Sequence, residues 1–131
     1  MHATTLRVRT YECDAYGHVN NAIYLNYLEY ARDLFLEHQG LDYQGLLSTG
    51  YGIWVAEAKL TFLSPALPGE DLTVTSEPHD SGAAWAVLKQ TILGPGNRLV
   101  VEALIKLVWV GPTGRPTRIP PDWREKLLTR A

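Results

Sequence analysis

The segment Tyr11–Arg32 reads "YECDAYGHVNNAIYLNYLEYAR" and joins an expected strand to an expected long helix. Before and into this segment, residues 5–13 alternate apolar and polar side chains, and a period of two is typical of a strand. From residue 22 to residue 38 the apolar side chains recur every three or four positions. That spacing predicts an amphipathic helix of about 17 residues, roughly 25 Å long. Asn20 or Asn21 is placed to cap its start.

The rest of the chain predicts four further strands, separated by turns that contain glycine and proline. They span residues 51–63, 71–77, 83–93 and 99–110. In the first of these, alternation places five side chains on one face: Trp54, Ala56, Ala58, Leu60 and Phe62. A short helix is expected over residues 122–129. One long helix with an antiparallel sheet of about five strands predicts an α+β fold in which the sheet wraps around the helix.

Length and composition narrow the possible functions. A chain of 131 residues is close to the commonest domain size, so residues 1–131 are expected to form a single domain. The net charge is −2 and the basic residues are scattered, which argues against a nucleic-acid partner. The start lacks the apolar core of a signal peptide, and no apolar run is long enough to span a membrane. Cys13 is the only cysteine, which favours a reducing compartment, and we expect a cytoplasmic protein.

An open sheet has two exposed edges. Unpaired edge strands promote association unless they are covered. We therefore expect a homodimer, or a homotetramer built from dimers, in which the sheet of one copy continues into that of another.

The polar residues before the long helix suggest acyl-transfer chemistry. Asp14 stands where a strand gives way to a loop, from which it could act as a nucleophile or as a base for water. The free N–H groups at the helix start, around Asn21, could stabilise a developing oxyanion. Gly17 lets the backbone turn tightly, and His18 could bind substrate or transfer a proton.

Simpler structural roles exist for the same residues. Asp14 and His18 could only shape the loop, and Asn20 and Asn21 could only cap the helix. Cys13 is flanked by acidic residues, which weaken it as a nucleophile. The histidines have no metal-ligand spacing, so no metal is predicted. No phosphate loop or dinucleotide fingerprint is present, and no cofactor is predicted.

Three segments in order resemble one family. They are "CDAYGHVNNAIYLNYLEYAR" (13–32), "LTFLSPALPGEDLTV" (60–74) and "KLVWVGPTGRPTRIPPDWREKL" (106–127). They resemble the hotdog-fold acyl-CoA thioesterases of the 4-hydroxybenzoyl-CoA thioesterase-like branch. The resemblance implies a hotdog fold, an antiparallel five-stranded sheet curled around one long helix, with active sites between subunits. It also implies that Asp14 is the catalytic carboxylate and that the backbone N–H of Asn21 polarises the thioester carbonyl.

The first segment is also similar to plant acyl-ACP thioesterases. Those carry an additional asparagine two residues after the aspartate, where this chain has Tyr16, so His18 is kept as a secondary catalytic candidate. The expected reaction is hydrolysis of an acyl-CoA or acyl-ACP thioester to the free acid. The alternatives are an acyl-thioester-binding hotdog protein with little turnover and, ranked lowest, a hydratase.

Several residues are candidates for binding the acyl group and the CoA of the expected thioester substrate. Tyr24, Tyr27 and Leu28 on the helix, with Trp54 and Phe62 facing them, are expected to shape an acyl pocket. Gly17 and Asn20 are expected beside the thioester. Four cations are candidates for the CoA phosphates: Lys59, Arg98, Arg115 and Arg118.

Overall fold

The computed structural model describes residues 1–130. In chain order its elements are β1 (His2–Arg7), η1 (Thr10–Glu12), α1 (Ile23–His38), α2 (Tyr43–Ser48), β2 (Gly52–Phe62), β3 (Asp71–Ser81), β4 (Trp85–Leu93), η2 (Pro95–Asn97), β5 (Leu99–Val110) and α3 (Pro121–Leu128).

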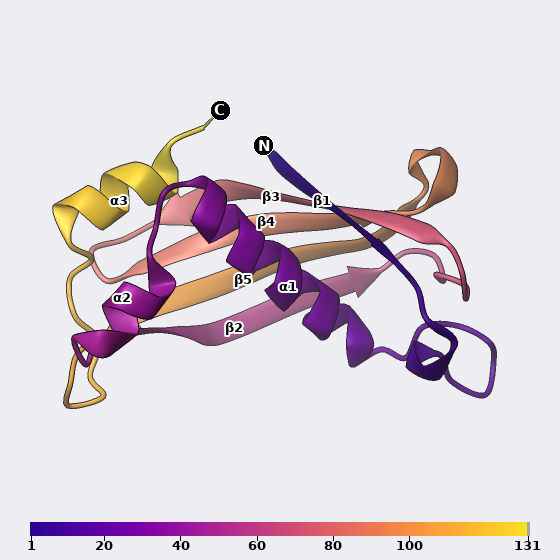
Figure 1. The fold of residues 1–131 in the computed structure, drawn as a ribbon, viewed down its shortest axis with the longest axis horizontal. Helices are drawn as coiled ribbons and strands as arrows, with labels where there is room; N and C mark the ends of the chain where they lie inside the picture. The colour runs from indigo at the N-terminus through magenta and orange to yellow at the C-terminus, as the bar shows by residue number, and fades with distance from the viewer. Residues whose placement is uncertain (131) are drawn as a thin grey trace.

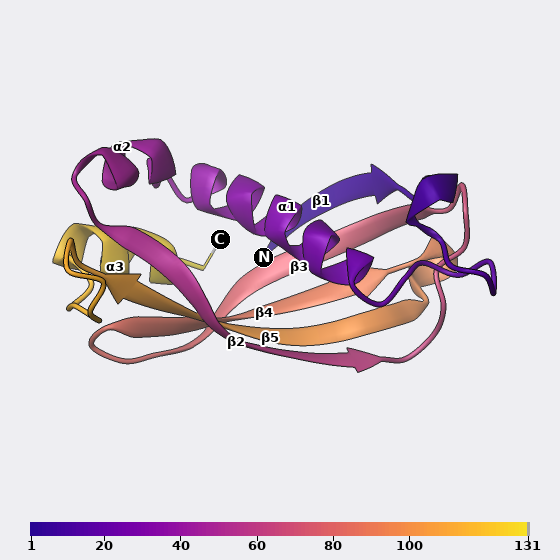
Figure 2. The ribbon, with the colours of Figure 1, turned by 90° about the horizontal axis from the view of Figure 1, so that it is seen from below.

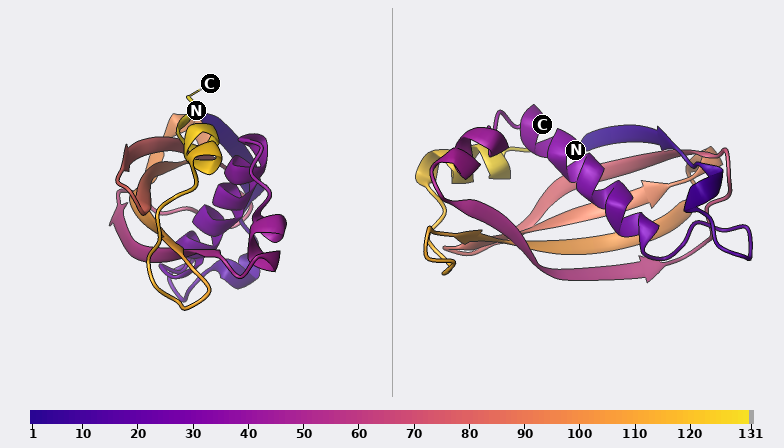
Figure 3. Two further views of the ribbon diagram at one scale, coloured as in Figure 1. Left: turned by 90° about the vertical axis from the view of Figure 1, so that its left-hand side faces the viewer. Right: turned by 60° about the horizontal axis from the view of Figure 1, so that its bottom comes forward.

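The strands form one sheet around the long helix. Five strands lie in the order β1-β3-β4-β5-β2, and every neighbouring pair is antiparallel. α1 lies against one face of this sheet (Figures 1 and 2), and the strands curve about it when the molecule is seen end-on (Figure 3, left). The expected α+β hotdog arrangement is therefore confirmed.

The core lies between α1 and the concave face of the sheet. Leu28, Ala31 and Phe35 recur at helical spacing on α1 and are almost completely buried. The sheet contributes alternate side chains that are equally buried, among them Leu72, Val74, Leu88, Ile92 and Ile105. Burial of one such side chain stabilises the fold by roughly 1.5–3 kcal/mol, so this contact determines where α1 lies.

A polar cluster inside this core links α1 to the sheet. The buried Gln90 of β4 donates from Nε2 to the Leu28 carbonyl and to Ser76 Oγ, both at 3.0 Å. Its Oε1 accepts from Arg32 Nη1 at 3.2 Å. Buried polar groups are costly when unpaired, so this cluster favours a single placement of the helix on the sheet.

Several predicted boundaries differ from the structure. β1 begins and ends earlier than the predicted strand at 5–13. Val8 still pairs with the backbone of residues 69 and 70, but the Arg9 N–H donates to the Glu12 carboxylate at 2.8 Å and residues 10–12 turn into η1. The sequence reading also missed α2, whose first turn is capped by Asp42 Oδ1 accepting from Gly45 N at 2.9 Å. The long and terminal helices match their predictions to within one residue.

The predicted face of β2 is wrong at Trp54. Val55 pairs with Leu107 and Glu57 with Lys106, so Ala56 is an extra residue in a β-bulge. The bulge inverts the alternation. Ile53 therefore takes the buried position, while Trp54 points to the outer face of the sheet and is 57% exposed.

No helix within residues 1–130 is long and apolar enough to cross a membrane.

The Gln90 cluster generates a stability prediction. Gln90→Leu keeps the side-chain volume but leaves Arg32 and the Leu28 carbonyl without their partner. We expect the free energy of unfolding to fall by at least about 2 kcal/mol, measured by urea denaturation at one protein concentration. Thr91→Ala, on the other face of the same strand, is the control and should change stability by under about 0.5 kcal/mol. A Gln90→Leu protein as stable as the unsubstituted chain would contradict the role given to the cluster.

Candidate active site

Asp14 lies in a loop that closes on itself before α1. Its N–H donates to the His18 carbonyl at 2.7 Å, and its carbonyl accepts from Gly17 N at 3.0 Å. Gly17 has φ +76°, a conformation that L side chains rarely adopt. Just outside this turn Cys13 pairs with Val19 as an antiparallel bridge. The loop is therefore a compact turn that carries Asp14 at its start.

The Asp14 carboxylate is only partly engaged by its own loop. Oδ1 accepts from Tyr16 N at 2.9 Å and from His18 N at 3.4 Å. Within residues 1–130 no hydrogen bond to Oδ2 is found. Asp14 is exposed and lines a cavity of about 300 Å³. One carboxylate oxygen thus orients the group and the other remains available to a ligand.

An apolar wall stands beside this carboxylate. Tyr24 from the first turn of α1 is buried, and its hydroxyl accepts from Ala66 N at 3.2 Å. The ring of Phe62, at the end of β2, lies 5.7 Å from the Tyr24 ring. Both residues line the Asp14 cavity together with Leu63, and Phe62 is 51% exposed. The cavity can therefore accept an apolar group next to the carboxylate.

Among residues 20–23, at the start of α1, one backbone donor is free. The N–H groups of Asn20, Ala22 and Ile23 are bonded to the Glu12 carbonyl, Asn20 Oδ1 and the Asn20 carbonyl respectively. The predicted cap is therefore wrong: Ala22 holds the N-cap position without a side-chain cap bond, and Asn20 instead accepts from Ala22 N just before the helix. The Asn21 N–H has no partner among the described residues, and Asn21 lines the Asp14 cavity. A free backbone N–H at a helix start is suited to an oxyanion.

Glu12 is a residue that the sequence reading missed. Its buried carboxylate accepts from the N–H and Nη1 of Arg9, at 2.8 and 3.1 Å, and from the Tyr27 hydroxyl at 2.8 Å. Burial alone would raise the pKa of the Glu12 carboxyl, but these hydrogen bonds outweigh it and hold that pKa below its usual value. The Tyr27 hydroxyl has a raised pKa through burial and its bond to Glu12. The chain before Asp14 is therefore tied to α1.

The signal for Glu12 was present but ambiguous in the sequence. An acidic residue two positions before Asp14 could have been any surface carboxylate, and only the packing of Tyr27 against it shows that it is buried.

A second connection borders the cavity. Arg98 forms an ion pair with Glu70 at 2.9 Å and donates to the Pro65 carbonyl at 3.0 Å and to Ser64 Oγ at 3.3 Å. Arg98 thus holds the loop after β2, which forms one side of the cavity. Because its guanidinium is engaged in this way, Arg98 is a poor candidate for the CoA phosphates.

Other predicted site residues lie in different places. His18 and Asn21 line the Asp14 cavity. Lys59 instead lines a separate hollow of about 240 Å³ with His79, Lys89 and Glu102. Trp54 lies on the outer face of β2, near the opposite end of the strand from Phe62. Within one copy of the chain, neither Lys59 nor Trp54 lines the Asp14 cavity.

Cys13 is placed poorly for nucleophilic chemistry. Its Sγ lies 3.8 Å from the Arg9 carbonyl. The pKa of its thiol is raised by burial and by the neighbouring Asp14 and Glu12 carboxylates. A raised pKa leaves less of the reactive thiolate at neutral pH.

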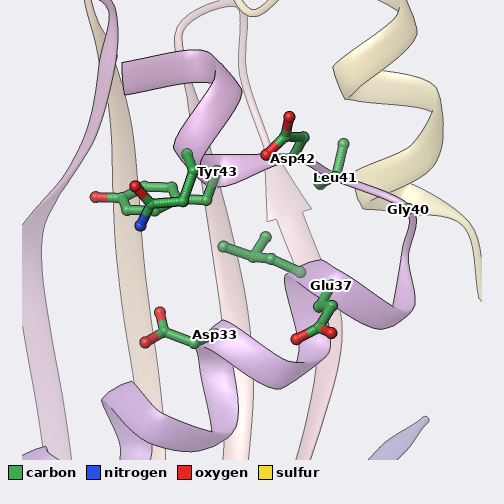
Figure 4. Close-up of a pocket in the computed structure, with 8 residues that line it drawn as sticks. Asp33, Glu37, Gly40, Leu41, Asp42 and Tyr43 are labelled. Atoms are coloured by element: carbon green, nitrogen blue, oxygen red, sulfur yellow. The ribbon is translucent and has the colours of Figure 1, made fainter. Parts of the chain in front are cut away.

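A larger hollow of about 570 Å³ lies at the other end of α1, between this helix and α2. Figure 4 shows the carboxylates of Asp33, Glu37 and Asp42 around it. Burial, then the nearby Glu29, raises the pKa of the Asp33 carboxyl. Several carboxylates repel an anionic substrate such as a CoA ester. The smaller cavity beside Asp14, which combines a carboxylate, a free N–H and an apolar wall, is therefore the better candidate.

Comparison with known proteins gives a consistent result. Residues 8–127 match the model of a family described as the thioesterase-like superfamily. The chain is 34% identical over 128 residues to an acyl-acyl carrier protein thioesterase, ATL3, of Arabidopsis thaliana, covering 97% of this chain and 67% of that protein. It is 33% identical over 126 residues to the long-chain acyl-CoA thioesterase FadM of Escherichia coli, covering 95% of both. The crystal structure of the probable thioesterase YbaW from Escherichia coli superposes with a TM-score of 0.84 at 33% identity, over 95% of each chain.

The hydrogen bonds that Arg9 and Tyr27 donate to the Glu12 carboxylate predict a particular dependence of stability on pH. The pKa of the Glu12 carboxyl is lower in the folded protein than in the unfolded chain, where it is about 4.3. The stability that the ionised carboxylate contributes is therefore fully present above the unfolded pKa and is lost as the pH falls through the folded pKa. Glu12→Gln should lower the free energy of unfolding by about 1–3 kcal/mol at pH 7. It should also flatten the loss of stability between pH 5 and pH 3, followed by urea denaturation at each pH. Glu37→Gln, an exposed change on α1, is the control. If Glu12→Gln and the unsubstituted chain lose the same free energy of unfolding between pH 5 and pH 3, the stabilising role of these hydrogen bonds is contradicted.

Proposed function

The chain belongs to the thioesterase-like superfamily and is a thioester hydrolase, and we propose that it cleaves an acyl-CoA with Asp14 as the reacting carboxylate. One observation carries the assignment of the site. Asp14 and Asn21, whose backbone N–H is free, line a single cavity that also has an apolar wall. These are the parts that acyl transfer needs: a base or nucleophile, an oxyanion donor and room for the acyl group.

The proposed reaction begins with the thioester carbonyl oxygen at the Asn21 N–H. Asp14 then accepts a proton from a water molecule that attacks the carbonyl carbon, and the C–S bond breaks to release the CoA thiol and the acid. Alternatively, Asp14 attacks directly and water hydrolyses the resulting anhydride. General-base assistance contributes roughly 10²–10⁴-fold and one oxyanion donor roughly 10²–10³-fold.

His18 and the other loop residues support this reaction in lesser roles. His18 lines the cavity, from where its imidazole can position the thioester or move a proton to the leaving thiolate. Gly17 and Asn20 keep the loop and the helix start in place through the turn and the Asn20 side-chain bond to Ala22 N. Tyr24 and Phe62 contact the acyl group.

A second candidate substrate is an acyl-ACP. The similarity to the chloroplast acyl-acyl carrier protein thioesterase favours it. A panel of short, medium, long and aromatic acyl-CoA esters, together with acyl-ACP, distinguishes the two by kcat/KM. A hotdog protein that binds acyl thioesters without turnover would show binding but no thiol release on the same panel.

The proposed working unit is a homodimer, or a homotetramer of such dimers. β2 lies at an edge of the sheet and presents exposed apolar residues, including Val55 and Phe62. A dimer buries that edge. The single cysteine favours a reducing compartment, so we place the enzyme in the cytoplasm.

Asp14→Asn tests the reacting carboxylate. The substitution keeps the size and hydrogen-bonding capacity of the side chain but removes its negative charge. We expect kcat to fall by at least about 10²-fold with little change in KM, because the lost interaction is made in the transition state. His18→Ala should cost less. Asp33→Asn, in the larger hollow, is the matched control and should retain activity.

The opposite result would mean that a residue other than Asp14 carries the reaction. If Asp14→Asn hydrolyses acyl-CoA at nearly the unsubstituted rate, the reacting carboxylate is misassigned. Glu29 and Glu57 would then be the next carboxylates to test.

Cys13→Ser tests the neighbouring thiol. Since burial and two carboxylates raise its pKa, the thiol should not be the nucleophile. We expect the variant to keep most of the kcat, measured by release of CoA thiol. If kcat falls by more than about a hundredfold while the circular dichroism spectrum is unchanged, Cys13 rather than Asp14 is the reacting residue.

A further inference from the structure

Asn20 is the residue at which the Asp14 loop meets the start of α1. This loop, between η1 and α1, projects from one end of the molecule (Figure 1). The N–H of Asn20 donates to the Glu12 carbonyl at 2.9 Å, which closes the loop. Its side-chain Oδ1 accepts from Ala22 N at 3.0 Å, and its carbonyl accepts from Ile23 N at 2.9 Å. Asn20 is therefore hydrogen-bonded both to the loop before it and to the turn that begins the helix.

These bonds act on the backbone of the turn and leave the cavity to the next residue. Among residues 1–130, Asn21 lines the Asp14 cavity and Asn20 does not. The side-chain oxygen of Asn20 is already engaged by Ala22 N. An effect of Asn20 on a bound thioester would therefore pass through the backbone that it holds.

The carbonyl bond of Asn20 determines where the Asn21 N–H points. The Asn20 carbonyl and the Asn21 N–H belong to one planar trans peptide group, in which the two bonds point in opposite directions. Ile23 N holds this carbonyl toward the first turn of α1. The Asn21 N–H is therefore directed away from the helix.

The side-chain bond of Asn20 holds the next peptide group in the same turn. The Ala22 N–H is one of the donors that a helix start leaves without an intrahelical partner. Because Asn20 Oδ1 accepts from it, this N–H does not compete with that of Asn21 for a ligand oxygen. An asparagine bonded to the N–H two residues later forms an Asx-turn, and the peptide group that it holds cannot rotate without breaking the bond. The turn thus offers one free donor in one orientation.

The loop connects this donor to the Asp14 carboxylate through a short backbone ladder. At one step of the ladder Asn20 donates to the Glu12 carbonyl. At the step nearer the loop tip Asp14 N donates to the His18 carbonyl at 2.7 Å. Catalysis requires that a base and an oxyanion donor keep their separation while the substrate reacts. Asn20 is the point at which the support of the base and that of the donor are joined.

We infer that Asn20 is a positioning residue for the proposed reaction: its side chain holds the turn before α1 in the conformation that presents the Asn21 N–H to the thioester carbonyl beside Asp14. The inference rests on the proposed function in taking the Asn21 N–H as the oxyanion donor. Asn20 touches no reacting atom in this role. Its loss misaligns the donor, and the effect is greatest in the transition state, where the oxyanion forms.

Asn20→Ala tests the role of the side-chain acceptor. We expect kcat to fall by about 10–100-fold with KM changed by less than about twofold, because the donor is misaligned and not deleted. The measurement uses the acyl-CoA ester of the panel with the highest kcat/KM. Asn20→Ser should restore kcat to within about threefold of the unsubstituted chain, because a serine hydroxyl can accept from the N–H two residues later, as asparagine does.

Asp42→Ala is the matched control for the loss of such a bond. Asp42 Oδ1 accepts from Gly45 N at 2.9 Å at the start of α2, away from the Asp14 cavity. Both alanine variants should lower the urea midpoint, but only Asn20→Ala should lower kcat. An Asn20→Ala protein that keeps its kcat, an Asn20→Ser protein without recovery, or an equal loss of kcat in Asp42→Ala would each refute the positioning role.

The two proposals fail in different ways. If Asp14→Asn loses activity and Asn20→Ala keeps its kcat, the proposed function stands and the positioning role is refuted. If Asp14→Asn keeps nearly the unsubstituted kcat while Asn20→Ala loses it and Asn20→Ser recovers it, the reacting carboxylate is misassigned and the positioning role is supported.

Discussion

The contact between α1 and the concave face of the sheet is the interaction on which the rest of the molecule depends. Leu28, Ala31 and Phe35 bury one face of the helix, and Gln90 links the same face to the sheet through Arg32 and the Leu28 carbonyl. Because apolar contacts can slide but paired buried polar groups cannot, the two together place the helix in one position. The position of the helix start, and therefore of the Asn21 N–H, follows from this contact.

The candidate site is a loop held from two directions. On one side Glu12 accepts from Tyr27 of α1 and from Arg9, which ties the chain before Asp14 to the helix. On the other, Arg98 holds the loop after β2 through Glu70 and the Pro65 carbonyl. Rigid support of this kind matters for catalysis, because a carboxylate and an oxyanion donor must keep their separation while the substrate reacts. The ionic groups near the cavity thus serve mainly to position its walls.

The edge strand β2 connects the fold to the site. Its bulge at Ala56 moves Trp54 to the outer face and brings Val55 to the helix-facing side. The strand ends at Phe62, which lines the Asp14 cavity, so the unpaired edge and the open side of the cavity are continuous. An inserted residue in one strand therefore decides which side chains are available both to a second copy and to the acyl group.

The sequence by itself determined the long helix, the antiparallel sheet and the loop that carries Asp14, because each depends on local periodicity or on residues close in the chain. It also determined the thioesterase-like family through three segments of ordered similarity. Only the tertiary structure decided the early end of β1, the buried Glu12 and the true face of Trp54. Two of these depend on a partner distant in sequence: Tyr27 for Glu12 and β5 for the bulge in β2. The early end of β1 follows from the local turn in which the Arg9 N–H donates to the same Glu12 carboxylate. Alternation along one strand cannot reveal a bulge, since the extra residue is defined by the register of the neighbouring strand.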